Sequence, residues 1–217
     1  MKLRNHSLSF FTMLLLGTAA FLFMGGCVTT GMDRSVKTSN SIKEVDSDIR
    51  KINILIDVTA KSLDSVIKAG QPDLKNAFDT YSDEVAELDS QGKKVLKHID
   101  EMKSRSTEYF AEWQKQGETY TNPQIRELSD ERRNKLAEIY ARVPAAGSGI
   151  KRAYLAYLVD LKEIQTYLSN DLTPDGITAI TPVAEKSDRD AEALKTSLEP
   201  VLTALDEINA ELYSKKK

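Results

Sequence analysis

Apolar residues recur at alternating steps of three and four along most of this chain, from residue 42 to residue 212. In an α-helix this spacing places them in a narrow stripe on one face, at the a and d positions of a heptad. A β-strand would instead need strict alternation of apolar and polar residues, and no stretch of useful length shows it. The sequence therefore predicts an all-α fold.

Four segments carry this heptad pattern, and turn residues separate them. Gly70 and Pro72 follow the first segment, residues 117–121 follow the second, and residues 170–173 follow the third. Glycine commonly ends a helix, and proline commonly begins the next one. Short connections between long helices favour antiparallel neighbours. We therefore expect an elongated antiparallel helical bundle, an intramolecular coiled coil of about four long helices, over residues 39–217.

Prolines and small residues interrupt the predicted helices. Pro144 lacks a backbone donor and clashes with the preceding turn, so we expect a kink or a short break in the third helix. Pro182 and Pro200 should each bend or split the fourth helix. Gly92 and Ser106 occupy seam positions, where a small residue either lets two helices approach closely or leaves a cavity. The sequence leaves both outcomes open.

Residues 1–26 have the order of an export signal. Lys2 and Arg4 precede an apolar run over about residues 10–24, and small residues follow that run. This order is typical of a signal peptide that is removed. Two alternatives stay open, an uncleaved transmembrane helix and cleavage at another position. Removal takes away two basic residues and no acidic one, so the remaining chain is more acidic than the whole, whose net charge is −3.

Residues 24–27, Met-Gly-Gly-Cys, resemble the lipobox of bacterial lipoproteins. The resemblance implies that Cys27 begins the mature chain and carries acyl groups on its sulfur and its amino group. Several acyl chains anchor a protein essentially permanently, because each buried methylene contributes about 0.8 kcal/mol. Residues 27–38 are rich in Thr and Ser and would form a flexible tether. Val28, where some lipoproteins have Asp, implies the outer membrane, with the protein on its inner leaflet and facing the periplasm.

The composition excludes several classes of function. One cysteine cannot build a disulfide framework. His98 is the only histidine after residue 26, and a metal site needs several converging ligands, so we expect an exposed histidine and no metal site. The 30 basic and 33 acidic residues give no concentrated positive field for nucleic acid. We therefore expect no enzymatic activity, and no cofactor apart from the covalent acyl lipid on Cys27.

Aromatic residues mark two places in the sequence. Tyr109, Phe110 and Trp113 cluster near the end of the second segment. Aromatic residues at helical spacing most often belong to the core or close the end of a bundle, and the alternative is a contact surface for a partner. Tyrosines are frequent in the third segment and include Tyr154 and Tyr157. We expect their hydroxyls to reach the surface, and the alternative is that they line a ligand site.

The connection at residues 167–173, Tyr-Leu-Ser-Asn-Asp-Leu-Thr, is the most individual part of the sequence, and Gly176 follows it. Asn170, Asp171 and Thr173 have side chains suited to closing one helix and beginning the next. The alternative is that these three residues form a polar recognition tip far along the rod.

The lipobox, the heptad-rich body and the Tyr-Leu-Ser-Asn-Asp-Leu-Thr stretch together resemble a family of bacterial lipoproteins that contain an uncharacterised coiled-coil domain. The resemblance covers the whole mature chain. It implies a helical envelope lipoprotein with no established activity, and it supplies no catalytic residues.

These features predict an outer-membrane-anchored periplasmic lipoprotein that acts as a non-enzymatic structural or protein-interaction module. Its expected partners are the membrane, through the lipid anchor, and an envelope protein bound by a helical face or by the distal tip. The seams can also pair between chains, which would give a homo-oligomer. The alternative function is a bundle that binds a lipid or another apolar ligand in its interior.

Overall fold

The structure is a computed structural model that describes residues 31–68 and 73–213. The predicted signal peptide, the predicted lipidation site Cys27 and the predicted turn at residues 70–72 lie outside the described residues. The described residues form four long α-helices and contain no strand, which confirms the all-α prediction. The helices are α1 (Gly31–Ile67), α2 (Leu74–Gly117), α3 (Pro123–Asn170) and α4 (Pro174–Tyr213).

Side chains that cap backbone amides set several of the helix starts. The Asp73 side chain accepts a hydrogen bond from the backbone N–H of Asn76 at the start of α2. The Asn122 side chain accepts from the backbone N–H of Gln124 at 2.9 Å, and Pro123 occupies the first turn of α3. A capping oxygen replaces a partner that the first helical amides lack, and proline has no amide to satisfy. The predicted turn chemistry is therefore confirmed at the start of α3, whereas the predicted first-turn residue of α2, Pro72, lies outside the described residues.

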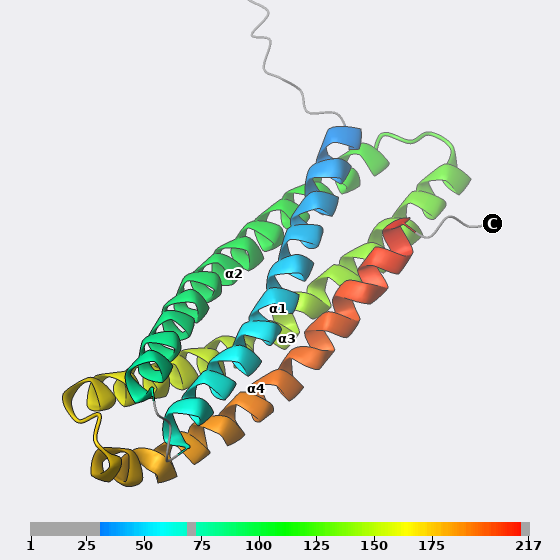
Figure 1. Cartoon of the computed structure of the whole chain (residues 1–217). Helices are drawn as coiled ribbons and strands as arrows, with labels where there is room; N and C mark the ends of the chain where they lie inside the picture. The colour runs from blue at the N-terminus through cyan, green and yellow to red at the C-terminus, as the bar shows by residue number, and fades with distance from the viewer. Residues whose placement is uncertain (1–30, 69–72, 214–217) are drawn as a thin grey trace, which may run out of the picture.

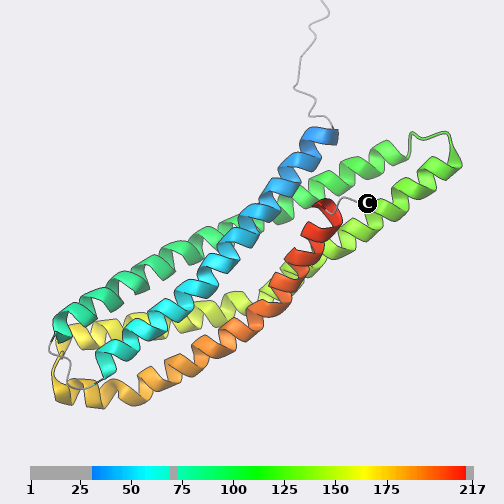
Figure 2. The ribbon, with the colours of Figure 1, turned by 45° about the vertical axis from the view of Figure 1, so that its right-hand side comes forward.

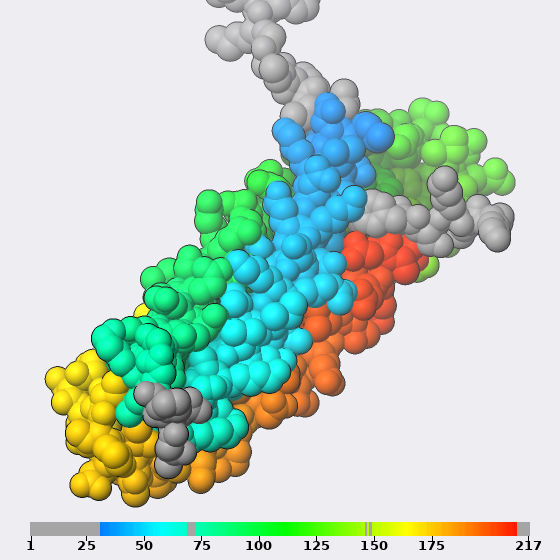
Figure 3. Space-filling model, viewed as in Figure 1, coloured from blue at the N-terminus to red at the C-terminus, as the bar shows by residue number. Residues whose placement is uncertain are grey.

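The four helices pack side by side as an elongated antiparallel bundle (Figures 1 and 2). α1 lies between α2 and α4, and α3 closes the ring by packing against the same two helices. With 48 residues, α3 is about 70 Å long. The space-filling view shows the resulting rod (Figure 3).

The predicted heptad seams form one continuous hydrophobic core along the rod. Ile42, Tyr81, Leu88, Leu161 and Leu205 have no exposed surface, and they come from all four helices. Burial of this apolar surface supplies the main driving force for the fold.

Prolines do not break the helices, so the break that was one expected outcome at Pro144, and the split that was one expected outcome at Pro182 and Pro200, do not occur. α3 runs without interruption through Pro144, and α4 runs through both of its prolines. Each proline loses a backbone hydrogen bond, but a core residue lies within two positions of it, as buried Val143, Ala184 and Val201 show. That packing holds the helical path. The bend predicted for α4 is visible in its C-terminal half (Figure 2).

α1 begins at Gly31, eight residues before the predicted start of the bundle at residue 39. Thr38 and Ser41 are buried, and the Ser41 hydroxyl donates to the Thr38 carbonyl oxygen at 2.7 Å. This local bond satisfies a polar side chain inside the helix interface. Residues 31–38, predicted as tether, are therefore part of the helical rod.

Candidate functional site

The predicted recognition tip lies at the far end of the bundle, by which we mean the end that contains the α3–α4 connection. That connection is opposite the start of α1 (Figure 1). The Thr173 hydroxyl donates to Asp171 Oδ1 at 2.6 Å and accepts from the backbone N–H of Gly176 at 3.1 Å. The Asn170 side-chain amide donates to the Thr166 carbonyl oxygen at 2.8 Å. All three predicted tip residues therefore take part in closing α3 and beginning α4.

The turn between α3 and α4 depends on the glycine at position 176. A Cβ atom at this position would overlap the carbonyl oxygen of Asp171, so the turn requires a glycine. Asn170 and Thr173 are exposed and Asp171 is half-buried. The hydrogen bonds that close α3 and begin α4 account for the placement of these three side chains. Their role in recognising a partner stays a prediction.

The three predicted contact aromatics lie on α2 near the opposite end of the rod, and two of them contact α3. Tyr109 lies 5.2 Å from Phe110 and 5.5 Å from Trp113, measured between ring centroids. Phe110 meets Tyr140 of α3 edge to face, and the Trp113 indole N–H donates to the Ser129 hydroxyl at 2.8 Å. All three rings are half-buried, and Phe110 and Trp113 join α2 to α3.

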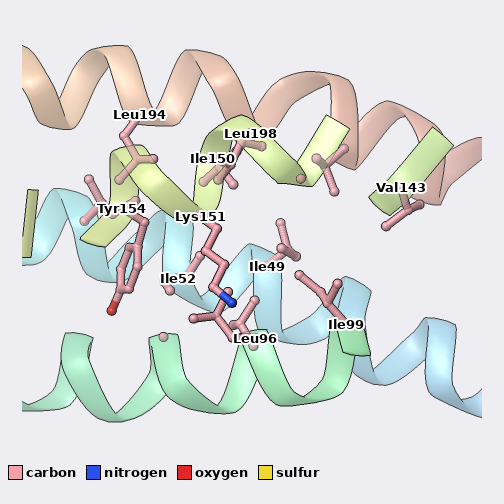
Figure 4. Close-up of a pocket in the computed structure, with 15 residues that line it drawn as sticks. Ile49, Ile52, Leu96, Ile99, Val143, Ile150, Lys151, Tyr154, Leu194 and Leu198 are labelled. Atoms are coloured by element: carbon pink, nitrogen blue, oxygen red, sulfur yellow. The ribbon is translucent and has the colours of Figure 1, made fainter. Parts of the chain in front are cut away.

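The interior contains a small apolar cavity between the four helices (Figure 4). Ile52, Ile99 and Leu198 line it, and Gly147 and Lys151 lie beside it on α3. Its volume is about 40 Å³. A cavity of about 150 Å³ is the size that accommodates benzene, so this one holds no acyl chain in the described conformation.

Both outcomes left open for small residues occur. A Cβ atom at Gly92 would overlap the Tyr154 hydroxyl, so this glycine allows α2 and α3 to approach closely. Gly92 and Gly147 both line the cavity, and nothing lies within 4 Å of a Cβ atom at Gly147. The hydroxyl of the seam residue Ser106 donates to the Lys103 carbonyl oxygen within α2.

Two tyrosines of α3 contradict the expectation that their hydroxyls reach the surface. Tyr154 and Tyr157 are both buried. The Tyr154 hydroxyl donates to the Leu88 carbonyl oxygen at 2.7 Å, and burial raises the pKa of both phenols above the ordinary value. Neither group is poised to act as a base near neutral pH.

The main feature that the sequence analysis missed is a cluster of four polar side chains, Asp48 and the three that contact it. Asp48 is only 4% exposed and lies in the α1–α2 interface. Its Oδ1 accepts hydrogen bonds from the Gln91 amide at 3.1 Å and from Lys94 Nζ at 2.9 Å, and its Oδ2 lies 2.6 Å from His98 Nδ1. His98 is therefore not the exposed histidine that was expected. Burial alone would raise the pKa of Asp48, but hydrogen bonds from Lys94, His98 and Gln91 hold it below its usual value.

A second polar cluster, around Asp188, lies where α4 meets α1 and α3. Tyr157 Oη, Ser187 Oγ and Asp188 Oδ1 are buried, and none of them hydrogen bonds to another group among the described residues. Burial raises the pKa of Asp188, and the neighbouring carboxylate of Asp64 raises it further. This cluster therefore contains polar groups that the fold leaves unsatisfied.

The contacts of the Asp48 cluster are contacts between helices. The partners of Asp48 all belong to α2, so their hydrogen bonds join two helices. Within residues 31–68 and 73–213, no group of three or more His, Cys, Asp or Glu side chains is arranged to hold a metal ion. Across the same ranges, no helix has the length and apolar character needed to cross a membrane.

A family model described as a protein of unknown function, DUF2959, matches residues 34–212. The chain belongs to the DUF2959 family. The match begins in the first turn of α1 and ends in the last turn of α4, so the family domain and the helical bundle coincide. The predicted lipobox precedes the matched residues and stays a prediction. No curated protein and no solved structure matches the chain.

Proposed function

We propose that this DUF2959 protein is an envelope lipoprotein whose helical bundle is held at a membrane by acyl chains on Cys27. The observation that carries the proposal is the export-type segment at residues 1–26, followed directly by a cysteine in a lipobox-like sequence. The start of α1 at Gly31, four positions after Cys27, supports it, because a rod that begins so close to an anchor is held near the membrane surface.

We further propose that the bundle acts without catalysis, by binding another envelope protein. Two pairs of exposed apolar side chains on the sides of the rod support this role, Ile54 and Val58 on α1 and Leu155 and Val159 on α3. Each pair is spaced by one helical turn, so its members share a face that a partner helix can cover. The predicted tip at Asn170 is the second candidate contact.

We do not extend the proposal to a lipid held inside the bundle. The interior cavity is apolar, as that alternative requires, but its volume of about 40 Å³ is far below what an acyl chain fills. In the proposed function the acyl chains are attached to Cys27, outside the bundle.

Mass spectrometry of the N-terminal peptide tests the anchor. We expect the mass of a peptide that begins at Cys27 with its acyl groups, and we expect Cys27→Ser to release the protein from the membrane fraction. A mature chain that begins at any other residue would contradict the proposal. Separation of outer from inner membranes on a density gradient tests the predicted location, and recovery with the inner membrane would contradict it.

Crosslinking of intact envelopes tests the partner. We expect the wild type to crosslink to a defined envelope protein, and the variants Leu155→Ser/Val159→Ser and Asn170→Ala distinguish the helical face from the tip. Loss of the crosslink in only one variant identifies the contact. If the wild type crosslinks to no other envelope protein, the interaction role is wrong, and a crosslink to a second copy would indicate the homo-oligomer instead.

A further inference from the structure

Among the described residues, the first turns of α3 have no neighbour on the side that α4 covers elsewhere. α4 ends at Tyr213, and near this end Glu211 pairs with Arg132 and lies 3.0 Å from Lys135 of α3. Because the two helices are antiparallel, residues 123–131 of α3 extend beyond the end of α4. Figure 2 shows the α2–α3 connection projecting past it.

Two large apolar side chains are exposed in this extension. Ile125 is 49% exposed and Leu128 is 66% exposed. They lie three positions apart on one helix, so they share a face. Both continue the apolar pattern of α3 toward its N-terminus, and within residues 31–68 and 73–213 they are uncovered because α4 is described only as far as Tyr213.

The exposed pair lies at the same end of the rod as the start of α1. A side chain at Gly31 would come within 3.7 Å of Gln116 Oε1, next to the last residue of α2. Met32, in the first turn of α1, is 73% exposed. The beginning of α1 and the end of α2 therefore meet at this end (Figures 1 and 3).

The position of Cys27 limits how far this end can move from a bilayer. Gly31 lies four positions after Cys27, and a fully extended chain over four positions spans at most about 14 Å. With its acyl chains in the bilayer, Cys27 holds the exposed apolar residues at a high local concentration next to lipid. A free protein has no such tether to this end of the rod.

From these observations we infer that this end of the bundle docks on the lipid bilayer, with Ile125 and Leu128 of α3 and Met32 of α1 inserted at the membrane interface. The inference rests on the proposed lipid anchor. Residues 114–128 carry two basic and two acidic side chains, so the contact is apolar and not electrostatic. Docking therefore occurs on uncharged phosphatidylcholine vesicles and persists at high salt, since salt screens only charged contacts.

The test uses the acylated, full-length mature protein bound to phosphatidylcholine vesicles. The sulfur of an acylated Cys27 is blocked, so a single introduced cysteine takes an environment-sensitive dye. Gln124→Cys places the dye beside Ile125, and Thr178→Cys places it on an exposed position near the far end. Lipids with brominated acyl chains quench a dye that lies at the membrane interface. We expect quenching of the dye at position 124 and none at position 178.

A variant pair shows whether the apolar side chains make the contact. Ile125→Ser/Leu128→Ser should abolish the quenching at position 124 while the protein stays on the vesicles through its anchor. The matched control is Ile54→Ser/Val58→Ser, which removes another exposed apolar pair of the rod, 61% and 37% exposed, and should leave the quenching unchanged. Circular dichroism checks that both variants keep their helices, as expected for exposed positions.

The outcomes separate the two proposals. If the N-terminal peptide carries no acyl groups, the proposed function itself is wrong. If the peptide is acylated and the dye at position 124 is not quenched, or both variant pairs behave alike, the docking inference is wrong and the anchor stands. A dye that becomes buried with rising protein concentration in the absence of vesicles would show a second copy on this face and would also overturn the inference.

Discussion

Two aspartates of this bundle, Asp48 and Asp188, meet opposite environments inside the same fold. Asp48 lies between α1 and α2, where three side chains point donors at its carboxylate. Asp188 lies beside the carboxylate of Asp64, and one of its oxygens is buried without a hydrogen-bond partner among the described residues. The pKa of Asp48 is consequently lowered and that of Asp188 is raised. Burial disfavours both charges, and the neighbours decide which charge is kept.

The contrast shows at which helix interfaces polar contacts fix the packing of one helix against another. The Asp48 cluster fixes α1 against α2, because its hydrogen bonds form in one register of the two helices. The Asp188 cluster contributes no such bond from Tyr157 or Ser187. We therefore expect changes near Asp48 to cost stability and changes near Asp188 to cost little or to help.

The largest effect is expected for Asp48→Ala. The substitution leaves the Gln91 amide and His98 without the carboxylate that they contact, and removing one partner of a buried polar cluster costs about 3 kcal/mol. Urea denaturation followed by circular dichroism measures the change in the free energy of unfolding. The control is Glu87→Ala, which removes an exposed ion pair with Lys51 in the same α1–α2 interface and should cost less than about 1 kcal/mol. Equal losses of stability in the two variants would show that the buried cluster contributes no more than the exposed ion pair.

Acid should erase the advantage of Asp48 over asparagine at the same position. A carboxyl whose pKa is lowered on folding stabilises the protein above its ordinary pKa of 3.8, and this contribution disappears as the pH falls through the lowered value. Wild type should exceed Asp48→Asn by about 2 kcal/mol at pH 7, because hydrogen bonds to a charged group are the stronger ones. Unfolding free energies measured from pH 7 down to pH 2 should converge below about pH 4. A gap that stays constant with pH would contradict this interpretation.

A smaller contrast is expected between two buried tyrosines. The Tyr81 hydroxyl donates to the Leu161 carbonyl oxygen at 2.7 Å, whereas the Tyr157 hydroxyl has no hydrogen-bond partner among the described groups. Tyr81→Phe should therefore lower the free energy of unfolding by about 1 kcal/mol, and Tyr157→Phe should leave it unchanged or raise it. Thermal unfolding of the two variants side by side provides the measurement. The reverse order would show that the Asp188 cluster is satisfied in solution.

The smallest effect is expected for Asp188→Asn, and its sign is opposite to that of Asp48→Asn. The raised pKa means that folding favours the protonated carboxyl, so ionisation weakens the fold as the pH rises above the ordinary value of 3.8. The variant should be more stable than wild type by about 0.5 kcal/mol at pH 7, because the partial exposure of the group screens the effect. The difference should vanish near pH 3. A variant less stable than wild type at pH 7 would contradict the assignment.

Local patterns in the sequence predicted much of the architecture. The heptad spacing correctly assigned many core positions, including Tyr81 and Leu161, but it also placed Ile125 and Leu128 in the seam, and these two side chains are exposed. The order Asn122-Pro123 correctly marked the start of α3. Of the two outcomes expected at Pro144, a kink or a break, the structure excludes the break, because the packing of the surrounding residues outweighs the low helix propensity of proline. The candidate tip at Asn170, Asp171 and Thr173 was correctly placed on the α3–α4 connection, because turn chemistry is local.

The Asp48 cluster shows why contacts between distant residues could not be predicted from the sequence. Asp48 and His98 are fifty positions apart, and neither has a neighbour in sequence that signals the other. A polar residue directly before the seam residue Ile49 is the one hint that Asp48 meets another helix. Which residues contact Asp48 depends on the register and the orientation of α2 relative to α1.

The sequence by itself determined that the chain forms four amphipathic helices with turns between them, because helical period and capping depend on residues a few positions apart. The tertiary structure decided which polar groups are paired, since Asp48 finds donors and Asp188 finds a carboxylate only after the helices are in register. It also decided that Ile125 and Leu128 stay uncovered, because that depends on where α4 ends relative to α3. Contacts between distant residues follow from the packing of the whole core, and no local pattern encodes them.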